Sequence, residues 1–170
     1  MLEATLGPRA LLRVQTWQIN APPPAEAEQL LGSKWQSAVG TVVALGDADT
    51  QLLCMGPTDW LLLAPAHGID RRLPALTAAL AASLYRVTNV SSALTRLGLT
   101  GPHARTVLSK VCALDMHAVA FPAGRCARTR LAGIPVVLHC QDSDAFEAIV
   151  AASYRDYLLA WLRDATLEFS

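Results

Sequence analysis

Segments with the two-residue period of a β-strand alternate along this chain with segments that have the three- to four-residue period of an α-helix. The expected strands are residues 10–19, 40–45, 50–54, 59–63, 85–90, 94–99, 126–131, 134–139 and 146–150. Helices are expected near residues 24–32, 69–84 and 101–111 and from residue 153 onward. Alternation of this kind restricts the chain to folds in which helices cover a sheet.

The same order of elements occurs twice. Each half contains a strand, a helix, a set of strands and a second helix, and the first half closes with a further strand. This order is typical of the split β-α-β unit of ferredoxin-like folds. The sequence therefore predicts an α+β protein made of two ferredoxin-like (split β-α-β) half-units, roughly residues 1–92 and 93–170, within a single domain.

Particular residues mark the expected helix ends. Pro24 is expected in the first turn of the first helix and Gly32 at its end. The turn-forming residues 46–49 are expected to join two strands. The last helix is expected to begin at Ser153 as its N-cap. Its buried side is expected to consist of four residues at helical spacing, Tyr154, Leu158, Trp161 and Leu162.

The composition excludes several classes of function. Of the 170 residues, 52% are hydrophobic and 16% are charged, and the 14 Lys and Arg residues balance the 14 Asp and Glu residues. A chain without excess charge has no long-range field that attracts nucleic acid or a membrane surface. No apolar run approaches the roughly 18 residues of a membrane span, and no secretory segment is recognisable. We therefore expect a cytoplasmic protein with no nucleic-acid or membrane partner.

No arrangement of residues indicates a metal, nucleophile or phosphate site. Zinc sites carry close pairs of Cys or His ligands, whereas the four cysteines here are scattered. His139 and Cys140 are neighbours on an expected strand, where their side chains point to opposite faces. Ser91 and Ser92 lie in no GxSxG turn, and no glycine-rich phosphate loop is present. We therefore expect no catalytic residue and no metal site in this chain.

Two segments have alternative interpretations. The run GPTDWLLLAP is too apolar for a strand that is exposed on either face. Trp60 is therefore expected either in the core or, as an anchor, in a subunit interface. Arg125, Arg128 and Arg130 alternate along an expected strand, and Arg128 is expected to face away from the other two. Arg128 then points inward or toward a partner, or it lies on an ordinary exposed face.

Four segments in a fixed order resemble a known family. They are GPTDWLLLAP, VTNVSSALTRLGLTGPHARTVL, CALDMHAVAFPAGRCARTRL and DAFEAIVAASYRDYLLAWLRDA, within roughly Leu53 to Ala165. The most specific feature is the order Cys112, Leu114-Asp115, Phe121-Pro122, Gly124 and Arg128-Thr129, followed by an aromatic-rich helix. The chain resembles the gamma subunit family of heterotetrameric sarcosine oxidase, which is similar to the folate-binding domain of the glycine-cleavage aminomethyltransferase.

The resemblance implies an accessory, non-catalytic subunit of a complex that oxidises sarcosine to glycine. That complex releases peroxide and passes the one-carbon unit to tetrahydrofolate. The implied partners are the large alpha subunit and the beta and delta subunits. FAD, FMN, NAD and tetrahydrofolate are expected on the other subunits, zinc on the smallest one, and no cofactor on this chain.

The resemblance also suggests what the residues of the second half do. Asp115 is expected to cap the connector between the expected helix and strand, Phe121 to pack it and Gly124 to turn it. Arg128 and Thr129 are expected to brace the adjoining strand. With Trp60, these residues are interpreted as structural or interface residues.

One departure from the related aminomethyltransferases concerns a cofactor contact. They carry an Asp-Val-Ser-like segment where this chain has Asn89-Val90-Ser91. Asparagine cannot act as a carboxylate base or pair with a cationic ligand nitrogen. Asn89, Ser91 and Arg128 remain the candidates for cofactor contact. Two other functions stay open: a stand-alone folate-binding or one-carbon-transfer protein, and an unrelated homodimer that pairs through the Trp60 strand.

Overall fold

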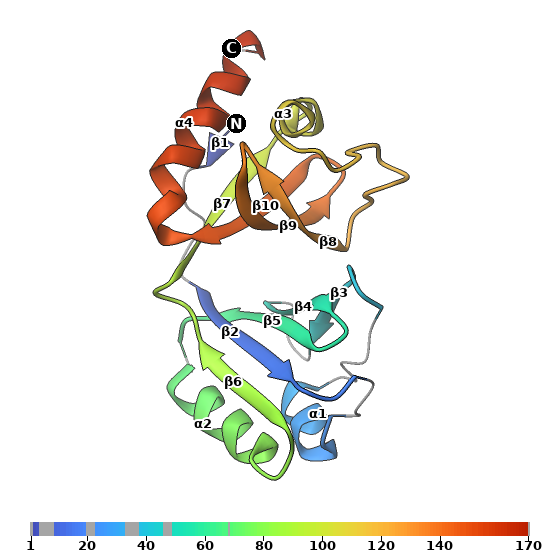
Figure 1. Ribbon diagram of the computed structural model, residues 1–170, viewed down its shortest axis with the longest axis vertical. Coiled ribbons are helices and arrows are strands. Elements are labelled where there is room, and N and C mark those ends of the chain that lie inside the picture. The colour runs from blue at the N-terminus through green and yellow to red at the C-terminus, as the bar shows by residue number, and fades with distance from the viewer. Residues whose placement is uncertain are drawn as a thin grey trace. The chain divides into compact units, whose positions relative to one another are not determined.

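The computed structural model describes residues 2–3, 9–19, 23–32, 38–45, 49–67 and 69–169 (Figure 1). The chain forms two compact units, an amino-terminal unit (Pro8–Ser91) and a carboxy-terminal unit (Ser92–Ser170 with Met1–Gly7). Over the described residues, each unit contains a five-stranded antiparallel sheet and two α-helices. The α+β class predicted from the alternation is therefore confirmed. Residues 46–48 of the expected turn lie outside the described residues.

The amino-terminal unit arranges its strands in the order β3-β4-β5-β2-β6. Its elements are β2 (Arg9–Thr16), α1 (Ala25–Leu31), β3 (Val42–Leu45), β4 (Thr50–Gly56), β5 (Asp59–Pro65), α2 (Ile69–Leu80) and β6 (Tyr85–Asn89). Gly32 ends α1 in the left-handed conformation at a φ of 70°, as expected for a glycine after a helix. The helix expected near residues 69–84 was predicted too long, because α2 ends at Leu80 and Leu84 is exposed.

The core of this unit lies where α1 and α2 cover the sheet. It contains ten buried residues, Leu12, Val14, Ala27, Leu45, Leu52, Cys54, Trp60, Leu62, Leu76 and Leu80. Every residue of β5 from Asp59 to Ala64 is buried, although successive side chains point to opposite faces. The strand DWLLLAP is therefore buried on both faces, as its apolar composition indicated.

The carboxy-terminal unit has the strand order β1-β7-β10-β9-β8. Its elements are β1 (Leu2–Glu3), β7 (Leu94–Thr100), α3 (Ala104–Val111), β8 (Arg125–Leu131), β9 (Ile134–Asp142), β10 (Ala145–Ala151) and α4 (Arg155–Thr166), with short 3-10 turns at Ala152–Tyr154 and Leu167–Phe169. The amino-terminal strand β1 pairs with β7. The two units thus divide the chain differently from the halves taken from the sequence, which assigned residues 1–92 to one half.

Helices α3 and α4 pack on one face of this sheet and on each other. Leu158, Leu159 and Leu162 bury the inner side of α4. The prediction for α4 was wrong in two respects. Ser153 is not its N-cap, because a 3-10 turn precedes the helix and Tyr154 takes that position. Tyr154 and Trp161 are each 45% exposed rather than buried.

The described helices include none that is long and apolar enough to cross a membrane.

Candidate functional site

The connector from Leu114 to Gly124, which the sequence singled out, is held by hydrogen bonds to its backbone groups and by one buried ring. Asp115 Oδ1 accepts a hydrogen bond of 2.8 Å from the His117 backbone N–H. The Phe121 ring is buried in the core of the carboxy-terminal unit. Gly124 has a φ of +77°, and its N–H donates to the Cys140 carbonyl at 2.8 Å. Asp115, Phe121 and Gly124 thus lie where a cap, a packing residue and a turn are needed.

Arg105 on α3 forms further bonds to the connector. Its Nη1 donates to the carbonyls of Met116 at 2.8 Å and Phe121 at 3.0 Å. Its Nε donates to the Ser143 carbonyl at 2.8 Å, and the guanidinium lies 4.9 Å from the centre of the Phe146 ring. Arg105 therefore ties the connector to α3 and to the turn between β9 and β10. Arg105 was not among the candidate residues predicted from the sequence.

Cys140 contacts this arginine. Arg105 Nη2 lies 3.5 Å from Cys140 Sγ. Burial raises the pKa of the Cys140 thiol, and the guanidinium offsets this only in part. A buried thiol with a raised pKa is a poor nucleophile. The raised pKa favours the protonated thiol, so the contact with Arg105 does not activate Cys140 as a nucleophile.

Thr129 braces β8 against the end of α3. Its Oγ1 lies 3.4 Å from the Cys112 Sγ, and Cys112 forms a β-bridge with Leu131. Arg128 lies on the other face of β8 from Thr129 and is exposed. The prediction that Arg128 faces away from both Arg125 and Arg130 was wrong. Residues two apart on a strand share a face, so Arg128 and Arg130 lie together and Arg125 lies opposite.

Asn89 and Ser91 bond to each other at the end of β6. Asn89 Oδ1 accepts from the Ser91 hydroxyl at 2.6 Å and from the Ser91 N–H at 3.0 Å. The Ser91 Oγ in turn accepts from the Leu11 N–H at 2.9 Å. These bonds close a turn that joins β6 to β2. Arg128, the third candidate for a cofactor contact, belongs to the other unit.

Trp60 lies in the core of the amino-terminal unit with 8% of its surface exposed. Its ring centre lies 6.1 Å from that of Tyr85. The sequence left Trp60 either in the core or in a subunit interface, and in the structure it lies in the core.

The sheet of the carboxy-terminal unit contains a buried ionic cluster. Arg96 on β7 donates through Nε to Glu147 Oε1 on β10, and Gln141 Nε2 donates to Glu147 Oε2 at 3.0 Å. His139 Nδ1 lies 3.5 Å from Glu147 Oε2 and has no hydrogen-bond partner within the described residues. Burial alone raises the pKa of Glu147, but His139 and Arg96 together outweigh it and hold the pKa below its ordinary 4.5. Glu147 is therefore a stable carboxylate at neutral pH and a poor general acid or base.

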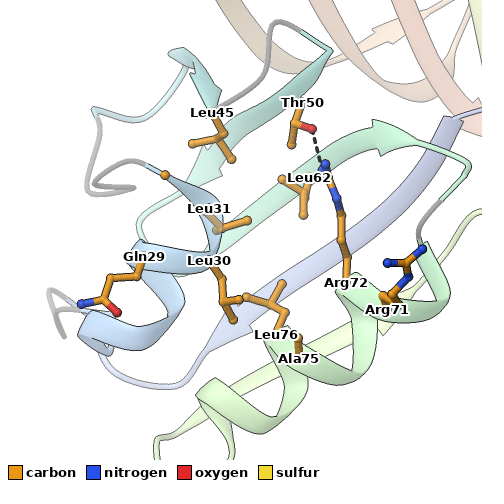
Figure 2. A pocket seen from close by; sticks show the side chains of 11 residues that line it. Gln29, Leu30, Leu31, Leu45, Thr50, Leu62, Arg71, Arg72, Ala75 and Leu76 are labelled. Carbon is orange, nitrogen blue, oxygen red and sulfur yellow. Dashed lines mark hydrogen bonds between the residues drawn. The ribbon is translucent and has the colours of Figure 1, made fainter.

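A cavity of about 440 Å³ lies within the amino-terminal unit, between the two helices and the sheet (Figure 2). Leu45, Leu62 and Leu76 form much of its apolar lining. Arg71 and Arg72 also line it, and Arg72 Nη1 donates to Thr50 Oγ1 at 2.7 Å. Such a lining suits an apolar group that carries a negative charge. None of the candidate cofactor, interface or structural-motif residues predicted from the sequence lines this cavity.

Metal-ligating side chains do not gather in the part of the chain that the structure describes. No three His, Cys, Asp or Glu residues there lie close enough together to hold an ion.

Comparison with known proteins assigns this scaffold to a family. The family model described as "Sarcosine oxidase, gamma subunit family" matches residues 20–168. The chain belongs to this family. The sarcosine oxidase subunit gamma of Corynebacterium sp. (strain U-96) is 36% identical to it over 135 residues, which are 79% of this chain and 64% of the relative. This chain therefore spans less than two thirds of that gamma subunit's length.

Two solved structures agree with the gamma subunit family. One chain of the heterotetrameric sarcosine oxidase from Corynebacterium sp. U-96, in complex with pyrrole 2-carboxylate, has a TM-score of 0.86 and 31% identity, covering 97% of this chain and 83% of that one. The glycine cleavage system aminomethyltransferase T of Bartonella henselae has a TM-score of 0.63 at 14% identity, covering 91% of this chain and 43% of that one. The second match shows that this chain has the fold of part of the aminomethyltransferase.

Proposed function

We propose that this chain is an accessory, non-catalytic gamma subunit of a sarcosine-oxidase-type complex, which converts sarcosine to glycine by oxidative demethylation. The observation that carries the proposal is the likeness to a chain of a solved heterotetrameric sarcosine oxidase over 97% of this chain. Membership of the gamma subunit family over residues 20–168 supports the same role.

The bonding of the sequence motif supports a scaffolding role. Asp115 Oδ1 is engaged by a backbone amide, and the Gly124 N–H is engaged by a backbone carbonyl. Phe121 is a core residue. Asn89 and Ser91 close a turn on each other. Side chains that are used in this way hold the fold together and are not free to act on a substrate.

The proposed partners are the large alpha subunit and the beta and delta subunits of the complex. We place the bound FAD, FMN, NAD and tetrahydrofolate on those subunits and none of them on this chain. Arg128 stays a candidate for contact with a partner or ligand, because its side chain lies on the exposed face of β8.

The strand order supports a finer description of the fold. In the amino-terminal unit, β2, β4, β5 and β6 with the two helices follow the split β-α-β order of a ferredoxin-like unit, and β3 is added at the edge. In the carboxy-terminal unit, β7, β9, β10 and β1 take the same places, and β8 is added at the edge. We propose that these two half-units form one gamma-subunit domain over residues 1–170.

Co-expression with the large subunits of the sarcosine oxidase from the same organism tests the function. Size-exclusion chromatography is expected to show the chain eluting with those subunits in one peak. A chain that stays separate from them at micromolar concentration contradicts the proposal.

Titration calorimetry of the purified chain with tetrahydrofolate tests the alternative of a stand-alone folate-binding protein. We expect no binding. Micromolar affinity in the isolated chain supports the alternative and contradicts the placement of the folate site on another subunit.

A further inference from the structure

Three large aromatic side chains lie in a row on one flank of the carboxy-terminal helix. Tyr154, the N-cap residue just before α4, is followed by Tyr157 and Trp161 within the helix at steps of three and four residues, a spacing that places side chains on one side of helical turns. Their exposed fractions are 45%, 47% and 45%. We call these three residues the aromatic stripe.

The aromatic stripe is not needed to hold α4 in place. Leu158, Leu159 and Leu162 already bury the inner side of the helix against the core. No hydrogen bond from the two tyrosine hydroxyls or the Trp161 indole N–H occurs within the described residues. Tyr and Trp side chains usually form such hydrogen bonds when they become buried. The hydroxyls and the indole N–H of the stripe can therefore bond to a second molecule that covers them. Tyrosine and tryptophan are also enriched among the residues that dominate binding at protein interfaces.

The charges of α4 favour a protein surface as the second molecule. Arg155 and Arg163 balance Asp156 and Asp164, so the helix carries no net charge. Binding to nucleic acid or to an anionic membrane needs an excess of Lys and Arg. An uncharged, aromatic surface with polar tips instead matches the apolar centre of an interface between two proteins.

The size of the aromatic stripe argues against a second copy of this chain. A Tyr or Trp side chain buries roughly 150–250 Å² in full, so three that are nearly half exposed offer about 200–350 Å². Two copies facing each other through the stripe bury about 400–700 Å² in total, below the roughly 1,000 Å² of a stable biological interface. A larger, different partner can surround the stripe with further contacts.

We propose that the aromatic stripe of α4 is the docking surface for another subunit of the sarcosine oxidase complex, whose contacting surface is apolar and carries little charge. The inference rests on the proposed function, because the complex supplies the partner. We assign the contact to the large alpha subunit of the proposed complex, since a larger partner can extend its contacts beyond the stripe on both sides of the helix.

The test compares single variants in the co-expressed complex. Trp161→Glu and Tyr157→Glu each place a charge at the centre of the proposed contact. Trp17→Glu is the matched control, because Trp17 is 72% exposed and lies in the amino-terminal unit. Circular dichroism and thermal melting check that all three variants fold as the wild type does. Co-elution and surface plasmon resonance against the purified large subunits measure binding.

We expect the two stripe variants to weaken binding by at least about thirtyfold and the control to bind as the wild type does. If the stripe variants fold and bind normally, the inference is overturned. The proposed function is unaffected in that case, because the wild-type complex still forms. Equal weakening by all three variants also overturns it. A wild-type chain that binds none of the subunits refutes the proposed function itself. A wild-type homodimer that Trp161→Glu dissociates shows that the stripe serves self-association and overturns the assignment to another subunit.

Discussion

Arg96 on β7 and Glu147 on β10 form an ion pair inside the carboxy-terminal unit, with 8% of the arginine side chain and none of the glutamate side chain exposed. The two residues are diagonal neighbours on one face of the sheet, because Glu147 lies opposite Gly98 and Arg96 lies opposite Ile149. Leu97 and its neighbours on the other face pack against the helices. Removing one partner of such a buried pair destabilises the fold strongly, because the other charge stays buried without its counter-charge.

Glu147→Gln is expected to lower the free energy of unfolding by about 3 kcal/mol, because it leaves the buried Arg96 without its counter-charge. The substituted amide keeps the shape of the side chain, so the loss reports the charge and not a cavity. Urea denaturation at neutral pH measures the change.

Glu168→Gln is the matched control for this variant. Glu168 pairs with Lys110 at 2.6 Å, but its side chain is 56% exposed. Removing a surface pair costs less than about 1 kcal/mol. If both variants lose the same stability, the Arg96–Glu147 pair is not the cause of the loss.

The folded chain is expected to lose stability in acid through Glu147. Its pKa is lowered below 4.5 in the folded state, so the unfolded chain binds the proton more readily as the pH falls. The contribution of Glu147 is therefore complete at neutral pH, begins to decline as the pH approaches 4.5, and is lost as the pH falls through the folded pKa. Urea titrations from about pH 7 to about pH 3 on the wild type and Glu147→Gln measure it. Parallel curves for the two proteins contradict the prediction.

Local signals allowed most of the elements to be predicted from the sequence. The position of Gly32 after a helical run, and the apolar strand from Asp59 to Leu63, depend on residues close together in the chain. The pairing of Leu2–Glu3 with β7 could not be predicted, because a two-residue strand has no periodicity and its partner lies far along the chain. Apolar spacing also cannot separate a core face from an exposed one. This is why Trp161 was expected to be buried.

The site was harder to predict than the fold. Asp115 and Gly124 lie at turns, and the residue types alone indicate such places. Arg105 was missed because it bonds to backbone carbonyls, which every residue has. A signal was nevertheless present. The connector that follows α3 has no strand or helix periodicity, so its backbone carbonyls lack regular partners. An arginine next to the buried residues of α3 is a suitable donor for them.

Gly124→Ala is expected to lower the free energy of unfolding by about 1 kcal/mol, because alanine is strained at a φ of +77°. Beyond the two adjoining residues, no heavy atom lies within 4 Å of the added Cβ, so the loss comes from the backbone conformation. Gly56→Ala is the control. A Cβ added at Gly56 lies in ordinary contact, 3.9 Å from the Asp59 Cβ, and the φ of Gly56 is not left-handed. Thermal unfolding of both variants measures the difference. A neutral Gly124→Ala shows that the turn adapts to alanine.

Arg105→Lys is expected to loosen the connector and to lower the free energy of unfolding by about 2 kcal/mol. A lysine ammonium keeps the charge, but its single nitrogen cannot replace the two guanidinium nitrogens, Nη1 and Nε, that together donate to the carbonyls of Met116, Phe121 and Ser143. Hydrogen exchange followed by mass spectrometry measures the protection of the connector amides.

The matched control for Arg105 is Arg130→Lys on β8, because Arg130 is exposed and donates through Nη1 to the Gly133 carbonyl at 3.2 Å. This variant is expected to leave the exchange of the connector unchanged. The Gly124 amide, which bonds to Cys140, is the most informative position. It should exchange faster in Arg105→Lys if the arginine holds the connector against the sheet. If Gly124 stays equally protected in both variants, the buried Phe121 ring is sufficient to fix the connector and the arginine bonds are dispensable.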